Sequence, residues 1–173
     1  MRDEAGLLMV YTGDGKGKTT AALGMVFRAL GHGLKVAMVQ FVKGKWKTGE
    51  RRFAETLPGL TFDVMGRGFT WDSDDLSQDR RAARAAWERS LTLLAAHHDL
   101  VVLDELTYCI HYGWLDEGEV LAGLAGRRAA THVVVTGRNA PAGLRSAADL
   151  VTEMHPEKHP FREGRRATLG VDY

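Results

Sequence analysis

The chain has 173 residues, 45% of them hydrophobic and 26% charged, which is ordinary for a soluble globular protein and excludes fibrous and disordered classes. Its 23 basic residues against 22 acidic ones leave no bulk charge for binding nucleic acid. One cysteine excludes an internal disulfide, and there is no signal-peptide pattern or long apolar span. We therefore expect one domain over residues 1–173, in the cytoplasm, with neither nucleic acid nor membrane as a partner.

The first informative stretch is a glycine-rich loop between an apolar run and a helical pattern. Residues 7–11 are apolar, residues 12–20 read TGDGKGKTT, and residues 21–30 are alanine-rich with helical spacing. A strand, a glycine loop and a helix start in this order are the context of a phosphate-binding loop (P-loop). Glycines let backbone N–H groups turn toward phosphate, Lys18 reaches phosphate oxygens, and the Thr19 hydroxyl can ligate Mg²⁺.

The loop departs from the standard pattern in its first position. The pattern G-x-x-x-x-G-K-[ST] places glycine where this chain has Thr12. A glycine-rich turn with surface lysines is the alternative interpretation, and the strand and helix on either side favour nucleotide polyphosphate binding. The residues predicted to hold the nucleotide are Gly13, Asp14, Gly15, Lys16, Gly17, Lys18, Thr19 and Thr20.

Strand and helix patterns then alternate to the end of the chain. Further strands are predicted at 35–42, 60–65, 100–105, 131–136 and 150–154. Further helices are predicted at 50–57, after a Ser77 cap, from about Asp116 to about Ala125, and after Pro141. In the first helix, apolar residues recur at helical spacing, at Leu23, Val26, Phe27 and Leu30. In the long helix capped by Ser77, one face is predicted to consist of Ala83, Trp87, Leu91 and Leu94. The arginines at 80, 81 and 84 are expected to face solvent.

This alternation predicts an α/β protein of three layers, like P-loop NTPases, with a mostly parallel central sheet. Function in such sheets lies beyond the carboxyl ends of the strands. The loops predicted to be neighbours there are 13–19, 43–49, 66–75, 104–105 and 137–139.

Polar residues with nucleotide chemistry follow two of the later strands. Asp104 and Glu105 end a buried apolar strand, where a P-loop protein places carboxylates that hold Mg²⁺ directly or through water. Arg138 follows the next strand and can contact phosphate, although an isolated loop arginine is more often a surface charge. The histidines and Cys109 form no zinc pattern, and Cys109 is expected to be a buried apolar residue.

Two aromatic residues, Phe69 and Trp71, stand out in the loop 66–75. They could form a small satellite core or an exposed platform for a flat ligand. Spacing alone favours the satellite core, because most aromatic side chains are buried.

Several segments together resemble the P-loop ATP:corrinoid adenosyltransferases of the cobalamin pathway, which modify cob(I)alamin or cobyrinic acid a,c-diamide. The matching segments are GDGKGKTT at 13–20, VQFVKG at 39–44, GE at 49–50, GFTW at 68–71, LDELTY at 103–108, TGR at 136–138 and GVDY at 170–173. They occur in the order of the family and extend over nearly the whole chain.

The resemblance implies transfer of the 5′-deoxyadenosyl group of ATP to the cobalt(I) of a corrinoid, with release of inorganic triphosphate. Cobalt is then the nucleophile, and the protein must align cobalt with C5′ and neutralise a polyanionic leaving group. The family binds the triphosphate in the sense opposite to ordinary NTPases. Lys18 and Lys16 would hold the triphosphate, and Thr19 and Glu105 would hold Mg²⁺ or Mn²⁺, with Asp104 as the other candidate metal ligand.

The resemblance also gives Phe69 and Trp71 a role, as a wedge beneath the corrin ring that displaces the lower axial ligand of cobalt. It further implies a homodimer and a flavoprotein or reduced flavin as electron donor. The family usually has asparagine where this chain has Asp14, whose charge is unfavourable beside triphosphate unless it faces a lysine, the metal or solvent.

Two other functions remain open at this point. One is a P-loop kinase or ATPase that acts on the γ-phosphate, and the other is a nucleotide-binding regulatory module without turnover. Neither alternative requires aromatic residues in the loop 66–75.

Overall fold

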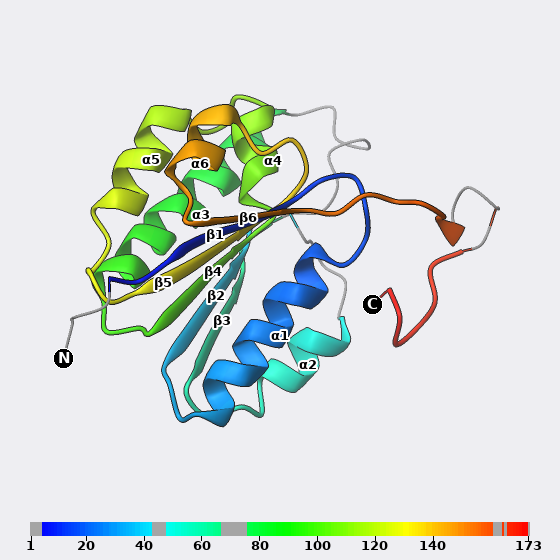
Figure 1. Cartoon of the computed structure of the whole chain (residues 1–173), viewed down its shortest axis with the longest axis horizontal. Coiled ribbons are helices and arrows are strands. Elements are labelled where there is room, and N and C mark those ends of the chain that lie inside the picture. The colour runs from blue at the N-terminus through cyan, green and yellow to red at the C-terminus, as the bar shows by residue number, and fades with distance from the viewer. Residues whose placement is uncertain (1–4, 43–47, 67–75, 161–163, 165, 173) are drawn as a thin grey trace.

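The computed structural model describes residues 5–42, 48–66, 76–160, 164 and 166–172. These residues form a six-stranded sheet in the order β3-β2-β4-β5-β1-β6, in which every pair of neighbouring strands runs parallel (Figure 1). The strands are β1 (Leu8–Thr12), β2 (Val36–Gln40), β3 (Leu60–Val64), β4 (Leu100–Asp104), β5 (His132–Thr136) and β6 (Leu150–Glu153). The predicted α/β class with a parallel sheet is confirmed.

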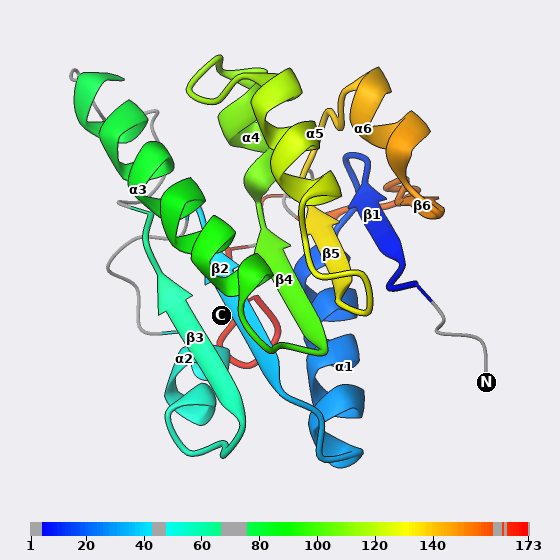
Figure 2. The ribbon, with the colours of Figure 1, turned by 90° about the vertical axis from the view of Figure 1, so that its left-hand side faces the viewer.

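Helices cover both faces of the sheet, so the fold has three layers (Figures 1 and 2). The helices are α1 (Lys18–Gly31), α2 (Gly49–Ala54), α3 (Leu76–Ala95), α4 (Leu106–His111), α5 (Glu117–Ala125) and α6 (Ala142–Ala147). On one face α1 packs its buried residues against alternate strand residues such as Met38 and Val102. On the other face, residues of α3, α4, α5 and α6 pack against Val39 and Leu103.

Burial on both faces explains why the strands are almost continuously apolar. Residues 36–40 and 100–104 are buried at every position. In each of these strands the last residue is polar, Gln40 in β2 and Asp104 in β4, and both lie at the carboxyl edge. The apolar core therefore ends at the carboxyl edge of the sheet, where the first buried polar side chains lie.

One apolar residue of α1 is exposed, and two local predictions for α3 are wrong. Phe27 is 73% exposed, because α1 faces the sheet with its small residues Ala22 and Ala29 and with Val26. Leu91 on α3 is 37% exposed, whereas the other residues of its predicted face are buried. Ser77 was expected before α3 but lies within its first turn.

The chain after β6 leads back toward the end of α1 that carries the glycine loop (Figure 1). Met154, directly after β6, forms backbone hydrogen bonds with Thr12 and Gly15. Among the described residues, no helix is long and apolar enough to cross a membrane.

Candidate nucleotide site at the carboxyl edge of the sheet

The glycine loop has the backbone that its sequence predicts. Gly13 and Gly17 have φ values of 92° and 111°, which L side chains rarely adopt, and α1 begins directly after Gly17. The Lys18 ammonium folds back over the loop and donates hydrogen bonds to the carbonyl oxygens of Gly13, at 2.7 Å, and Gly15, at 2.6 Å. The loop thus holds a cation at the amino terminus of a 14-residue helix, which is a favourable place for phosphate.

Met154, directly after β6, contacts the glycine loop. Its carbonyl oxygen accepts a hydrogen bond from the Gly15 N–H at 2.7 Å. A Cβ added at Gly13 would lie 2.4 Å from the same oxygen, so glycine is required there for space as well as for its φ angle. The sequence pattern did not reveal this contact, because it joins residues that are distant in the chain.

Asp104 is the centre of a buried hydrogen-bond network. Its Oδ1 atom accepts from the Thr19 hydroxyl at 2.9 Å and from the Thr136 hydroxyl at 2.7 Å. Its Oδ2 atom accepts from the Gln40 amide at 3.0 Å. The network therefore joins the start of α1 to the carboxyl ends of β2, β4 and β5. Of its members, Thr19 and Asp104 were predicted as site residues, whereas Gln40 and Thr136 were not.

Glu105 lies at the junction of β4 and α4. Its φ angle of 65° is left-handed, a conformation that costs energy for a residue with a side chain and that clusters at functional sites. Its backbone N–H donates to the Thr136 hydroxyl at 2.9 Å, which ties the junction to the Asp104 network. Glu105 is half-buried, and its charge acts on the Lys18 ammonium.

Arg138 is held over the glycine loop by the residues around it. The Thr107 hydroxyl donates to the Arg138 carbonyl oxygen at 2.6 Å. The Arg138 side chain lies beside Asp14, with 3.7 Å between Nε and Oδ1. The additional negative charge of Asp14 therefore faces a cation and solvent, which accounts for its presence in a phosphate-binding loop.

Thr12 has a structural role of its own at the position where the standard loop has glycine. Its buried hydroxyl accepts a hydrogen bond from the Ala140 N–H at 3.2 Å. The Gly137 N–H also donates to the Tyr11 carbonyl oxygen, at 3.2 Å. These two bonds fasten the loop after β5 to the end of β1, so that Arg138 and the glycine loop are neighbours.

Lys16 and Lys18 have different surroundings. Lys18 is half-buried, and burial lowers its pKa from the usual value of 10.5, with a further lowering by the nearby Arg138. The Asp14, Glu105 and Asp104 carboxylates oppose this shift in the pKa of Lys18. Lys16 is half-exposed and forms an ion pair with Asp172 in the carboxyl-terminal segment.

Cys109 is fully buried, as expected, and burial raises the pKa of its thiol to about 12. The thiol therefore stays protonated and takes no part in nucleophilic chemistry. Burial also raises the pKa of Tyr108, which stacks on Tyr112 with 6.3 Å between the ring centroids. Phe69 and Trp71 lie outside the described residues.

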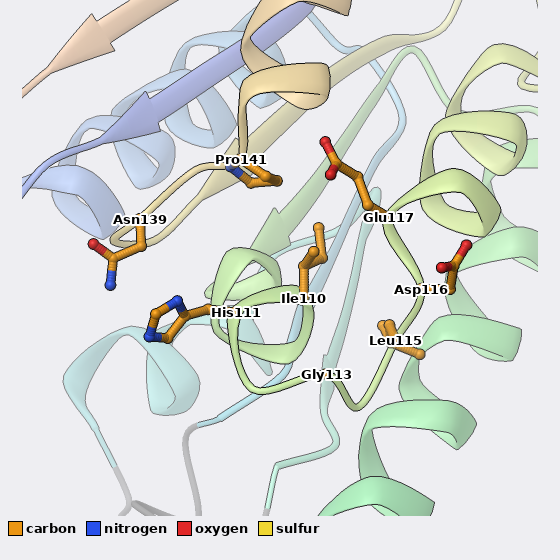
Figure 3. Close-up of a pocket in the computed structure, with 8 residues that line it drawn as sticks. All are labelled: Ile110, His111, Gly113, Leu115, Asp116, Glu117, Asn139 and Pro141. Atoms are coloured by element: carbon orange, nitrogen blue, oxygen red, sulfur yellow. The ribbon is translucent and has the colours of Figure 1, made fainter.

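A cavity of about 600 Å³ lies next to this edge, between α4, the start of α5 and the loop after β5 (Figure 3). Its two carboxylates serve as helix caps. Asp116 accepts from the Glu119 N–H at 2.9 Å, and Glu117 accepts from the Leu144 N–H at 3.2 Å. Both carboxylates of the cavity therefore have structural partners among the backbone N–H groups.

The parallel three-layer fold, the glycine loop that cradles Lys18 and the hydrogen bond from Thr19 to a strand-end aspartate define a P-loop nucleotide-binding protein. A comparison of structures agrees on the fold alone. The flagellar accessory protein FlaH from Methanocaldococcus jannaschii is similar with a TM-score of 0.56 and 14% sequence identity, covering 87% of this chain and 71% of that one.

The sequence comparisons identify the family. The ATP:corrinoid adenosyltransferase family BtuR/CobO/CobP matches residues 4–173, and the chain belongs to this family. A corrinoid adenosyltransferase of Pseudomonas aeruginosa is 49% identical, covering 99% of this chain and 86% of that one. Corrinoid adenosyltransferases of Escherichia coli K12 and Salmonella typhimurium are 45% and 44% identical, each covering 99% of this chain and 88% of theirs. The protein is thus an adenosyltransferase whose substrates are ATP and a corrinoid.

Proposed function

We propose that the glycine loop of this enzyme holds the triphosphate of ATP as a leaving group, while the cobalt(I) of the corrinoid attacks C5′ of the ribose. The cobalt–carbon bond forms as the bond from C5′ to the triphosphate oxygen breaks, and the electron pair leaves on triphosphate. The observation that supports this best is the position of Lys18, whose ammonium already occupies the centre of the loop at 2.6 and 2.7 Å from two carbonyl oxygens. Triphosphate oxygens would replace those carbonyl oxygens as acceptors.

In this proposal the residues around Lys18 share the charge of the leaving group. Lys16 and Arg138 lie at the exposed side of the loop, where they would contact the triphosphate from solvent. The N–H groups of residues 13–20 and the amino terminus of α1 would add partial positive charge. Neutralisation of the leaving group is the main electrostatic task of the protein, since the nucleophile belongs to the substrate.

The donor set fits Mg²⁺ or Mn²⁺. The Thr19 hydroxyl donates its hydrogen bond to Asp104, which leaves its oxygen lone pairs for a cation, and Glu105 adds a second carboxylate at the same edge. Among the described residues, no three histidine, cysteine or acidic side chains form a metal-binding group. A P-loop ion held by one hydroxyl, one or two carboxylates, triphosphate and water needs no such group. When bound, the ion supplies charge neutralisation at the triphosphate.

Asp104 has a separate role in this scheme. Its two oxygens accept three hydrogen bonds, which leaves it poorly placed to be a principal metal ligand. We assign Asp104 to positioning: it fixes the Thr19 hydroxyl and would accept a hydrogen bond from water on a bound ion. Thr19 and Glu105 are then the proposed direct ligands.

We propose Phe69 and Trp71 as the wedge beneath the corrin ring, on the strength of the family resemblance. Removing the lower axial ligand of cobalt lowers the orbital that accepts the next electron, so a reduced flavin or flavoprotein can produce cobalt(I). Trp71→Ala should leave ATP binding intact and abolish turnover with reduced flavin. Activity should return when cobalt(I) is supplied ready-made by a strong chemical reductant. Unchanged turnover with reduced flavin would exclude the wedge.

The family resemblance also supports a homodimer, and the composition supports a cytoplasmic location. Light scattering on the purified chain tests the first, and fractionation of the cells that express it tests the second. A monomeric enzyme with full activity would contradict the dimer.

The proposed reaction is tested by anaerobic incubation with ATP and a chemically reduced corrinoid, followed by identification of the products. Inorganic triphosphate together with a light-sensitive cobalt–carbon species is the expected result. ADP would indicate a kinase or ATPase instead. No product, together with nucleotide binding, would indicate a regulatory module. Lys18→Ala serves as the negative control, since it removes the central cation of the loop.

A further inference from the structure

The carboxyl-terminal segment returns to the glycine loop and places a carboxylate on one of its two lysines. The Asp172 Oδ1 atom forms an ion pair with the Lys16 ammonium. The Asp172 side chain is 21% exposed and that of Lys16 is 48% exposed, so the pair lies at the border between the site and solvent. Lys16 is also a residue that we propose to hold triphosphate.

A tight turn presents the Asp172 carboxylate to Lys16. Asp172 Oδ2 accepts from the Thr168 N–H at 2.7 Å, and the Asp172 N–H donates to the Thr168 carbonyl oxygen at 2.8 Å. Gly170, with a φ angle of 78°, permits the turn. One carboxylate oxygen is therefore used within the turn, and the other contacts the lysine.

Little apolar packing holds this turn against the rest of the protein. Leu169 and Val171 are 76% and 75% exposed. An ion pair at this degree of exposure is weak and screened by salt. The turn can therefore leave Lys16 at small cost, which would not be the case for a buried tail.

The triphosphate and the Asp172 carboxylate cannot both occupy Lys16 without strong repulsion, because both are anions at contact distance from the same ammonium. We propose that Asp172 is an internal anion that competes with triphosphate for Lys16. ATP binding then displaces the turn of residues 168–172 (the tail) from Lys16. The return of the tail to Lys16 favours departure of the triphosphate product. This inference rests on the proposed role of the glycine loop as the triphosphate site.

Competition of this kind is reciprocal. If triphosphate weakens the docking of the tail, the docked tail weakens the binding of triphosphate by the same factor. The dissociation constant for triphosphate is then raised by the inverse of the fraction of molecules in which the tail is undocked. Removing the Asp172 charge removes that penalty.

The test uses inorganic tripolyphosphate with Mg²⁺, measured by titration calorimetry at low ionic strength. Asp172→Asn should bind about three- to five-fold more tightly than the unchanged protein. Glu157→Gln, which removes an exposed carboxylate upstream of the tail, is the matched control and should change the dissociation constant less than two-fold. In a Lys16→Gln background, Asp172→Asn should have no further effect.

Hydrogen exchange gives an independent readout of the tail. In the unchanged protein, tripolyphosphate should accelerate exchange of the N–H groups of residues 168, 171 and 172, whose hydrogen bonds close the turn. Slower exchange of these groups, or weaker tripolyphosphate binding by Asp172→Asn, would show that the tail covers the ligand and would overturn the proposal. Equal binding by Asp172→Asn and the unchanged protein would overturn the competition and leave the triphosphate site standing. No binding by the unchanged protein would overturn both.

Discussion

Two sets of polar contacts meet at the glycine loop, one buried and one exposed. The buried set is centred on Asp104, which is fully enclosed and accepts three hydrogen bonds from Thr19, Thr136 and Gln40. The exposed set consists of two ion pairs, Lys16 with Asp172 and Arg138 with Asp14, each with partners in contact with solvent.

The buried set holds its side chains in one arrangement, whereas the exposed set can exchange one anion for another. A buried carboxylate that loses a donor leaves polar groups unsatisfied, which costs about 1–3 kcal/mol for each group, so the Asp104 network has one stable arrangement. Exposed ion pairs contribute roughly 0–1 kcal/mol and are replaced easily by another anion. The glycine loop therefore has a fixed hydroxyl, that of Thr19, on its buried side. On its exposed side it has two cations, Lys16 and Arg138, that can change partners.

Asp104→Asn should have the largest effect. The amide replaces one acceptor oxygen with a donor, so either the hydroxyls of Thr19 and Thr136 or the amide of Gln40 loses its acceptor. We expect a loss of about 1–3 kcal/mol in the free energy of unfolding and, because the network that orients Thr19 is disturbed, a fall in kcat on the order of 100-fold. Denaturant unfolding and steady-state rates of triphosphate release measure the two effects.

Asp99→Asn is the matched control for that substitution. Asp99 precedes β4 at the opposite edge of the sheet, and its Oδ2 atom accepts from the Lys35 N–H at 2.7 Å. It is exposed, so we expect kcat to stay within about two-fold. If Asp104→Asn behaved like Asp99→Asn, the buried network would not position the reaction.

Gly137→Ala should have the next largest effect, on stability. A Cβ at this position would lie 2.1 Å from the Thr107 hydroxyl, and the φ angle of 135° is strained for any residue but glycine. We expect a loss of about 2–3 kcal/mol in the free energy of unfolding. Thr107→Ala in the same chain removes the clash but also the hydrogen bond to the Arg138 carbonyl oxygen, so the double variant should lose less stability than the sum of the two single variants. Additive losses in the double variant would show that the clash is absent.

The buried set could be predicted in part from the sequence. Lys18 and Thr19 follow from the local glycine pattern, and Asp104 follows from a carboxylate at the end of an apolar strand. Gln40 also gave a signal, as the one polar residue near the end of the apolar run 35–42, and Thr136 ends a strand in the same way. Neither residue could be assigned, because a partner across the sheet depends on strand order, which hydrophobic periodicity does not determine.

The exposed set could not be predicted from local patterns. Its ion pair between Asp172 and Lys16 joins the end of the chain to its beginning, and so does the separate backbone contact of Met154 with Gly15.

Helix faces were predicted better than single residues. Phe27 lies one position from the buried Val26. Only the close approach of α1 to the sheet through its alanines determines which of these two side chains faces the sheet.

Lys18, which lies between the buried and the exposed set, should make the affinity for tripolyphosphate depend on pH. Burial lowers its pKa in the free protein, whereas bound triphosphate would raise it again by adding negative charge. Affinity for tripolyphosphate should therefore be complete below the lowered pKa and fall as the pH rises through it, at a pH below 10.5. Calorimetry in buffers of different ionisation enthalpy should detect proton uptake on binding in this range.

Lys18→Arg is the control for the pH effect. A guanidinium stays charged throughout this range, so the variant should bind with less affinity at neutral pH and without the alkaline fall. A fall of equal size in both proteins would place the titrating group elsewhere.

Asp14→Asn should have the smallest effect. The carboxylate repels triphosphate, yet it also holds Arg138 beside the loop, and the two contributions oppose each other. With 3.7 Å between Nε and Oδ1 and most of the Asp14 side chain in solvent, the ion pair is weak, and we expect the Kd for tripolyphosphate to fall by about two-fold. The change should disappear in 0.5 M salt. An increase in Kd would mean that Arg138 needs Asp14 to reach the ligand, and this ion pair would then belong with the contacts that position the site.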